Sequence, residues 1–137
     1  MRLKNIPGSR DVIAESPYVI HTPEQFRGHF RVYFAEEAGD TQPQSAGRPL
    51  HIEIGTGKGQ FIMAMAKRHP EVLYIGIEKY SSVLLRAVQK MEAADAETPQ
   101  AGGGAPENLR FIRLDAENIA DVFAENEVDR IYLNFSD

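Results

Sequence analysis

Glu53 and three glycines form the motif E-x-G-x-G-x-G within the segment HIEIGTGKGQF (51–61). Glycine has no Cβ, so a turn of this composition lets the backbone approach a ligand closely. Two common phosphate-binding loops do not match it. A Walker loop needs Ser or Thr where Gly59 follows Lys58, and the dinucleotide fingerprint needs glycine where Gln60 stands. We therefore expect a cofactor loop of another kind.

Carboxylates stand near the ends of the apolar segments around this loop. Glu53 lies in LHIEI (50–54), and Glu78 ends VLYIGIE (72–78). A carboxylate at the second position can accept hydrogen bonds from both hydroxyls of a ribose. Glu53 would repel a pyrophosphate but attract an ammonium or sulfonium group. With the shortened glycine spacing, these two acids favour S-adenosylmethionine as the ligand.

Two further acids, Asp115 and Asp137, follow the next two apolar segments. Each also has a simpler interpretation, because Asp115 could cap the helix that starts near Glu117 and Asp137 could cap a helix that follows it. Lys58 also has two possible interpretations. Its ammonium could neutralise a carboxylate of the ligand, or its side chain could simply point to solvent. Acids at or near the carboxyl ends of four successive strands, all at one sheet edge, nevertheless indicate a ligand site.

From residue 50 onward the sequence alternates strand and helix patterns, which is typical of parallel pairing with helices on both faces. We expect a Rossmann-like, doubly wound, mostly parallel α/β sheet, truncated after its fourth strand. The fourth segment, IYLNF, is too apolar for a free sheet edge, so the chain looks like part of a longer protein. The expected strands are 50–54, 72–78, 109–114 and 129–135, and the expected helices are 58–69, 81–94 and 117–124.

The N-terminal third has a different pattern. Residues 1–22 look irregular, with SPYVI (16–20) as a short extended piece. A helix is expected from the N-cap Thr22 to Gly39, because its aromatic residues recur on one face. We divide the chain into an N-terminal arm and helix (1–47) and the first half of a cofactor-binding domain (48–137). The aromatic residues of this helix are Phe26, Phe30, Tyr33 and Phe34.

Composition limits the classes of function. The 137 residues are 42% hydrophobic and contain no cysteine, which excludes disulfides and thiolate metal sites. The four histidines lack ligand spacing, so we expect no metal site and place them at the surface or in loops. No segment has the length and apolarity of a membrane span or the apolar core of a signal peptide, which favours a cytoplasmic protein without a membrane partner.

Charge is distributed unevenly along the chain. The net charge is −5, yet residues 1–34 hold five basic and three acidic residues. A basic arm on an acidic body can contact the phosphates of a nucleic acid, with Arg2, Lys4 and Arg10 as the candidates. An ordinary solvated tail is the alternative explanation.

Several of these segments resemble the bacterial tRNA (guanine-N7)-methyltransferase family, and the similarity extends over nearly the whole chain. HIEIGTGKGQFI, YIGIEKY and IYLNFSD carry most of it. The resemblance implies a class I S-adenosylmethionine-dependent enzyme that methylates N7 of a guanine in tRNA. It assigns cofactor binding to Glu53, Glu78 and Asp115, together with the glycine loop, and makes Asp137 the catalytic and guanine-contacting residue. The full cofactor set is Glu53, Gly55, Gly57, Gly59, Glu78 and Asp115, and the substrate set is Asp137, Arg2, Lys4 and Arg10.

The chain departs from that family in three places. The family continues beyond Asp137 with Pro-Trp-Pro-Lys, has a Pro-Trp pair where Pro7-Gly8 stands, and lacks the insertion AETPQAGGGAP (96–106). An N-terminal portion of such an enzyme is expected, with a homo-oligomer as one possible assembly. A non-catalytic cofactor- or nucleotide-binding fragment is the alternative. A nicotinamide-dependent oxidoreductase is disfavoured by Gln60 and Glu53.

Overall fold

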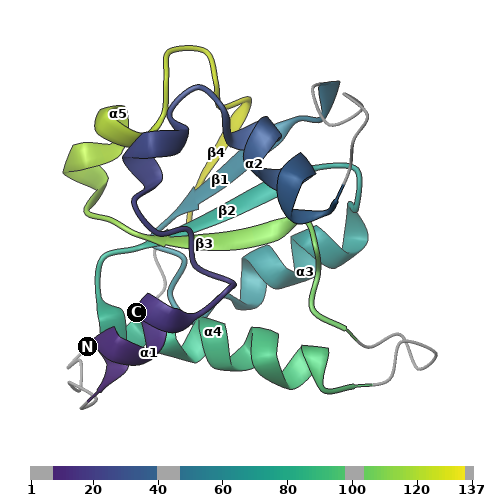
Figure 1. Cartoon of the computed structure of the whole chain (residues 1–137), viewed down its shortest axis with the longest axis vertical. Helices are drawn as coiled ribbons and strands as arrows, with labels where there is room; N and C mark the ends of the chain where they lie inside the picture. The colour runs from purple at the N-terminus through teal and green to yellow at the C-terminus, as the bar shows by residue number, and fades with distance from the viewer. Residues whose placement is uncertain (1–7, 40–46, 98–103, 135–137) are drawn as a thin grey trace.

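The computed structural model describes residues 8–39, 47–97 and 104–134. Four parallel strands pair into one sheet in the order β3-β2-β1-β4. This confirms the predicted parallel α/β sheet (Figure 1). The strands are β1 (Leu50–Ile54), β2 (Leu73–Glu78), β3 (Leu109–Arg113) and β4 (Arg130–Leu133).

The strand order reverses at β1. The chain moves outward from β1 to β2 and β3, and then returns to pair β4 with the free side of β1. In open α/β sheets, ligands bind beyond the carboxyl ends of the strands at such a reversal. The segment that follows β1 is the glycine loop, so the topology places that loop at the expected binding edge.

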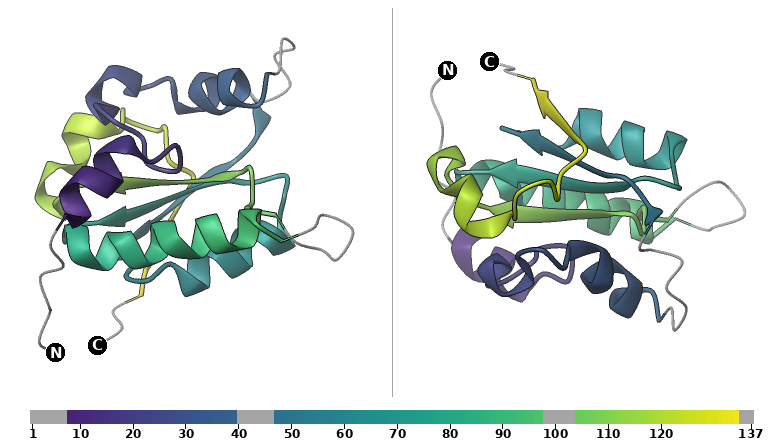
Figure 2. Two further views of the ribbon diagram at one scale, coloured as in Figure 1. Left: turned by 60° about the horizontal axis from the view of Figure 1, so that its bottom comes forward. Right: turned by 90° about the horizontal axis from the view of Figure 1, so that it is seen from above.

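Helices cover both faces of the sheet (Figure 2). Helices α3 (Gln60–Arg68) and α4 (Ser81–Asp95) lie on one face. Helix α2 (Phe30–Glu37), the 3-10 turn η1 (Pro23–Phe26) and helix α5 (Ile119–Val122) lie on the other, and a second 3-10 turn, η4 (Ala116–Asn118), leads into α5.

Each face of the sheet has its own apolar core, because successive strand residues point to opposite faces. In β2, Tyr74 belongs to the core beneath α3 and α4, whereas Ile75 belongs to the core beneath α2. All six residues of β2 are buried, as expected for a strand covered on both sides.

The expectation of irregular structure over residues 1–22 is wrong in part. Helix α1 (Ser9–Glu15) packs against α4 and buries Ile13 in the core. The extended piece within SPYVI is confirmed, because Val19 forms a parallel bridge with Phe111 of β3. The Ile20 amide donates to the Phe111 carbonyl at 2.8 Å, so the arm covers the outer side of β3.

The single helix predicted from Thr22 to Gly39 is also wrong. Gly28 has a φ of +83° and separates η1 from α2. The buried carboxylate of Glu127 accepts hydrogen bonds from the amides of Gly28 (2.8 Å) and Phe30 (3.2 Å), which satisfies donors at the start of α2. Thr22 caps nothing with its side chain, since its hydroxyl donates to the His21 carbonyl.

His51 is the histidine that departs from the predicted surface or loop position. It lies in the central strand β1, where its ring meets Tyr74 edge-on at 5.5 Å between centroids. Burial, followed by the neighbouring Arg130 guanidinium, holds the pKa of the His51 imidazole below its usual range. It packs as a neutral ring within the sheet at physiological pH.

Strand β4 is an edge of the sheet within the described residues, and it is apolar, as the sequence indicated. Ile131 and Leu133 are 53% and 57% exposed. They lie two residues apart and so point to the same face, whereas Tyr132 points to the opposite face and contacts Phe61 with ring centroids 5.2 Å apart.

We expect the 137-residue polypeptide to self-associate through β4. An apolar edge strand exposes backbone donors and acceptors that pair readily with another chain, and charges on such an edge oppose pairing. Ile131→Lys together with Leu133→Lys should therefore shift the polypeptide toward monomer in sedimentation velocity. Val32→Lys is the matched control, because Val32 is 53% exposed on α2. A monomeric unmodified chain would contradict this expectation.

Candidate cofactor site

The glycine loop between β1 and α3 needs three residues without side chains. Gly55, Gly57 and Gly59 have φ values of +76°, +58° and +81°, a region that side chains rarely adopt. The amides of Gly55 and Thr56 both donate to the Ile77 carbonyl at 2.9 Å, which holds the loop against the end of β2. A Cβ at Gly55 would meet no atom within 4 Å, so open space lies beside the start of the loop.

The far end of the loop packs tightly onto the sheet. A Cβ at Gly59 would lie 3.0 Å from the Ala87 Cβ, and a Cβ at Gly76 would lie 2.8 Å from the Phe111 ring. The Phe111 ring also comes within 3.4 Å of the Gly59 Cβ position. Glycine at both positions therefore lets Phe111 fill the space between the loop and β2.

Glu78 connects the second strand to the loop. Its carboxylate accepts hydrogen bonds from the amides of Gly57 at 2.9 Å and Tyr80 at 3.1 Å, one on each oxygen. The residue is 7% exposed. A carboxylate oxygen has two lone pairs, so each oxygen can accept one further donor. This arrangement is compatible with a diol ligand, provided that the hydroxyls approach from the open side of the loop.

Glu53 is almost fully buried at the end of β1. It is 2% exposed, and its oxygens accept hydrogen bonds from the Thr56 hydroxyl (2.6 Å) and the Asn134 side-chain amide (2.9 Å). Burial raises the pKa of this carboxyl above its usual range, although the two hydrogen bonds oppose the rise. Glu53 thus joins the glycine loop to the end of β4, while its contact with a ligand stays a prediction.

Asp115 has the capping role that the sequence left open. Its side chain accepts a hydrogen bond from the Glu117 amide at 3.0 Å and pairs with the Lys79 ammonium at 3.3 Å. These two contacts, the backbone bond first, hold the pKa of the Asp115 carboxyl below its usual range. Neither contact tests the predicted cofactor role of Asp115.

Of the remaining predicted residues, the structure describes Arg10. Arg10 is exposed on α1, and Arg2, Lys4 and Asp137 lie outside the described residues. Sequence reasoning missed Thr56 and Asn134, the two partners of Glu53. A hydroxyl inside the glycine loop and an amide shortly before the Asp137 position were the available signals, but only the fold brings them together.

The described part of the chain contains neither a candidate metal site nor a candidate membrane-spanning helix. Residues 8–39, 47–97 and 104–134 contain no group of three or more His, Cys, Asp or Glu side chains arranged to hold a metal ion. Nor does any helix within those ranges combine the length and apolarity needed to cross a membrane.

Residues 47–137 match the model of a protein family described as "Putative methyltransferase". The match covers the glycine loop and all four strands. The chain belongs to this methyltransferase family.

Similar proteins agree with this membership. The chain is 52% identical over its full 137 residues to a tRNA (guanine-N(7)-)-methyltransferase of Lachnoclostridium phytofermentans. It spans 55% of the length of that relative. The family resemblance seen in the sequence is thereby confirmed.

Solved structures give the same fold. An antibiotic-related methyltransferase aligns with 64% of this chain and 41% of its own, at a TM-score of 0.50 and 28% identity. The 16S rRNA (adenine(1408)-N(1))-methyltransferase of Catenulisporales acidiphilia aligns with 77% of this chain and 46% of its own, at a TM-score of 0.52 and 21% identity. The methyltransferase sheet is therefore the correct fold class for this chain.

The buried charge of Glu53 makes stability depend on pH. The pKa of the Glu53 carboxyl in the folded state lies above the ordinary value of 4.5. The folded state therefore loses stability as the pH rises from 4.5 through the folded-state pKa, because the buried carboxyl must ionise. Glu53→Gln has no charge to bury and should avoid this loss. We expect the free energy of unfolding of the variant, relative to the wild type, to be larger near pH 7 than near pH 4.5. Urea denaturation at the two pH values measures it, and an equal difference at both would contradict the argument.

Proposed function

We propose that the protein transfers a methyl group from S-adenosylmethionine to N7 of a guanine in tRNA. The observation that carries the proposal is the 52% identity over the full chain to a relative named for that reaction. Membership of the methyltransferase family supports the reaction class. The substrate and the activity belong to the proposal, because the chain spans about half of that relative.

The described residues fit the cofactor. Open space lies beside Gly55, where a ligand can approach the backbone, and Glu78 keeps one free lone pair on each oxygen for the ribose hydroxyls. When bound, S-adenosylmethionine supplies an electrophilic methyl group on a sulfonium. Glu53 and Asp115 complete the proposed cofactor set, with Glu53 contributing negative charge behind the loop.

The proposed reaction requires mainly that the protein align guanine N7 with the methyl carbon and the sulfur of the cofactor. Guanine N7 has an in-plane lone pair and no proton, so no general base is required, and positioning and electrostatics supply the rate enhancement. We assign to Asp137 the hydrogen bonds from the guanine N1–H and exocyclic amine. Asn134, three residues earlier in the sequence, donates to Glu53 at 2.9 Å, which joins the described end of the chain to the proposed cofactor site.

The decisive experiment is methyl transfer from labelled S-adenosylmethionine to unmodified tRNA, with the intact protein. Asp137→Asn keeps the size of the side chain but removes its charge. It should lower methyl transfer by at least about 100-fold while changing S-adenosylhomocysteine affinity less than about threefold, as expected for a group that acts on the transition state. Asp121→Asn, on the exposed side of α5, is the matched control and should change neither. Equal losses of transfer and cofactor binding in Asp137→Asn would contradict its assignment.

A second variant tests the cofactor site separately. Glu78→Gln replaces one acceptor oxygen by a donor amide, which cannot accept from Gly57 and Tyr80 together or hold a diol. S-adenosylhomocysteine affinity, measured by isothermal titration, should fall by about 10- to 100-fold. Glu71→Gln removes an exposed carboxylate and should leave the affinity unchanged. NAD binding without a response to S-adenosylhomocysteine would overturn the cofactor assignment, and cofactor binding without methylation of tRNA would favour a non-catalytic role.

A further inference from the structure

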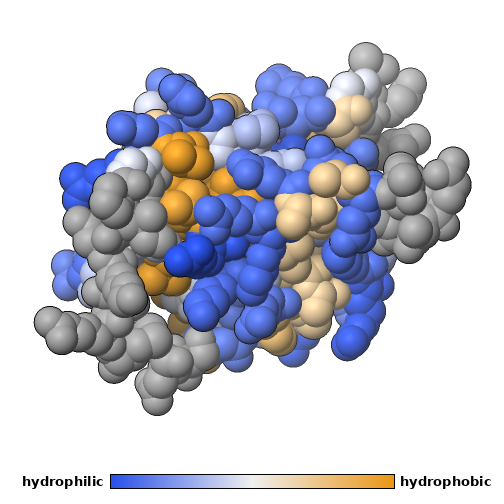
Figure 3. All heavy atoms as spheres, turned by 90° about the horizontal axis from the view of Figure 1, so that it is seen from below, coloured by the Kyte–Doolittle hydropathy of each residue, from blue (hydrophilic) through white to orange (hydrophobic). Residues whose placement is uncertain are grey.

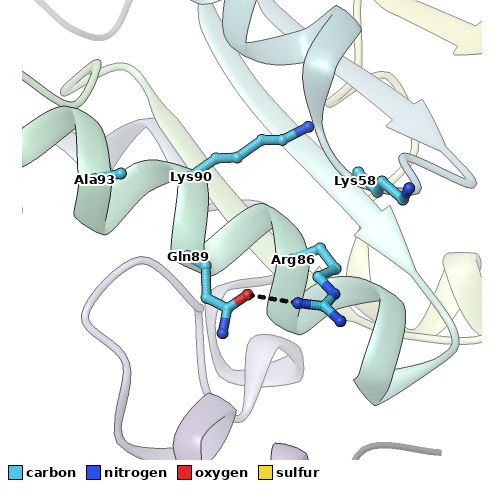
Figure 4. A pocket seen from close by; sticks show the side chains of 5 residues that line it. All are labelled: Lys58, Arg86, Gln89, Lys90 and Ala93. Carbon is cyan, nitrogen blue, oxygen red and sulfur yellow. Dashed lines mark hydrogen bonds between the residues drawn. The ribbon is translucent and has the colours of Figure 1, made fainter. Parts of the chain in front are cut away.

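A basic groove lies between the glycine loop and helix α4. Its volume is about 470 Å³, and it is lined by Lys58 of the loop and by Arg86, Gln89, Lys90 and Ala93 of α4. The side chains of Lys90 and Arg86 extend toward the side of the groove where Lys58 lies (Figure 4). None of the proposed cofactor acids lines it, so the groove is separate from the carboxylates at the sheet edge.

The three cations of the groove have no acidic partner within residues 8–39, 47–97 and 104–134. Among the residues that the structure describes, neither Lys58 nor Arg86 nor Lys90 forms an ion pair with a carboxylate. Arg86 donates to the Gln89 side-chain carbonyl at 3.3 Å. The Lys90 ammonium is buried without a hydrogen-bond partner in the described part of the protein.

Holding these charges together costs free energy in the absence of an anion. The pKa of the Lys90 ammonium lies below its usual range, first because of burial and then because of repulsion by Lys58. The protein as a whole is acidic, with a net charge of −5, so a positively charged groove with no internal carboxylate is a local exception. An anion bound between Lys58 and Lys90 would relieve both the desolvation and the repulsion.

We propose that this groove binds backbone phosphates of the RNA substrate, a contact that rests on the proposed function. The groove offers long lysine and arginine side chains, which suit successive phosphates of a polyanion. The molecular surface seen from below the view of Figure 1 is hydrophilic over much of its area, with an apolar patch and a separate, paler apolar band (Figure 3). Helix α1, which carries the exposed Arg10, packs against α4. Arg10 of the basic arm therefore lies on a helix that contacts α4, the helix that also carries Arg86 and Lys90 of the groove.

Lys58 belongs both to the proposed phosphate-binding groove and to the glycine loop of the cofactor site. It lies between Gly57, whose amide is bound by Glu78, and Gly59, which packs against Ala87 of α4. A phosphate on Lys58 would thus be held by the same loop that approaches the cofactor. Docking of the RNA backbone and placement of the target base would then share one rigid element of the fold.

The test measures the salt dependence of tRNA affinity in the intact protein. Arg86→Gln together with Lys90→Gln should weaken tRNA binding and reduce the slope of log K against log salt by about one to two, because each lost phosphate contact contributes about 0.7 to 0.9. Lys67→Gln with Arg68→Gln removes the same charge from the exposed end of α3 and should leave the slope unchanged. Arg86→Lys with Lys90→Arg keeps the charges and should retain the wild-type slope.

Isothermal titration with S-adenosylhomocysteine and thermal melting accompany each variant. Wild-type cofactor affinity and melting temperature together with the reduced slope support the groove as an RNA contact. An unchanged slope in Arg86→Gln/Lys90→Gln overturns it, even while the wild-type protein methylates tRNA. A loss of cofactor affinity with an unchanged slope also overturns it, since the cations would then serve the cofactor. Failure of the wild-type protein to bind or methylate tRNA would instead overturn the proposed function.

Discussion

The site depends on how closely the glycine loop approaches the sheet. Gly59 and Gly76 leave room for the Phe111 ring, and the Ile77 carbonyl receives two loop amides. A single added methyl group at Gly76 would have to displace both the Phe111 ring and the Thr56 hydroxyl, because packed interiors have little spare volume. The missing side chains of Gly59 and Gly76 therefore allow the loop to pack closely on the sheet, and the two hydrogen bonds to the Ile77 carbonyl hold it there.

Buried carboxylates hold this arrangement together across the strands. Glu53 connects the loop to Asn134 after β4, and Glu78 connects it to the turn that begins α4. Burying such charges is costly unless every oxygen is hydrogen-bonded, and in both residues each oxygen has a donor. The same acids that suit a ligand thus first stabilise the loop to which the ligand would bind.

Charge is separated over a short distance in this protein. Carboxylates gather at the carboxyl ends of β1 and β2, while Lys58, Arg86 and Lys90 gather beside the loop toward α4. The acidic edge suits a cofactor with a positive sulfonium, and the basic groove suits a phosphate backbone.

The sequence by itself determined the local features of this protein. The alternation of apolar segments predicted all four strands, α3 and α4, because this signal lies in short windows of the chain. The glycine spacing with Glu53 and Glu78 likewise gave a local prediction of a ligand site at the ends of β1 and β2. Only the tertiary structure decided the features that depend on distant partners. Glu127 interrupts the predicted N-terminal helix from about 100 residues away, Asn134 reaches Glu53 from β4, and the lysines of the groove come from two elements. Their partners are fixed by packing of the sheet and helices, which no local pattern of residues encodes.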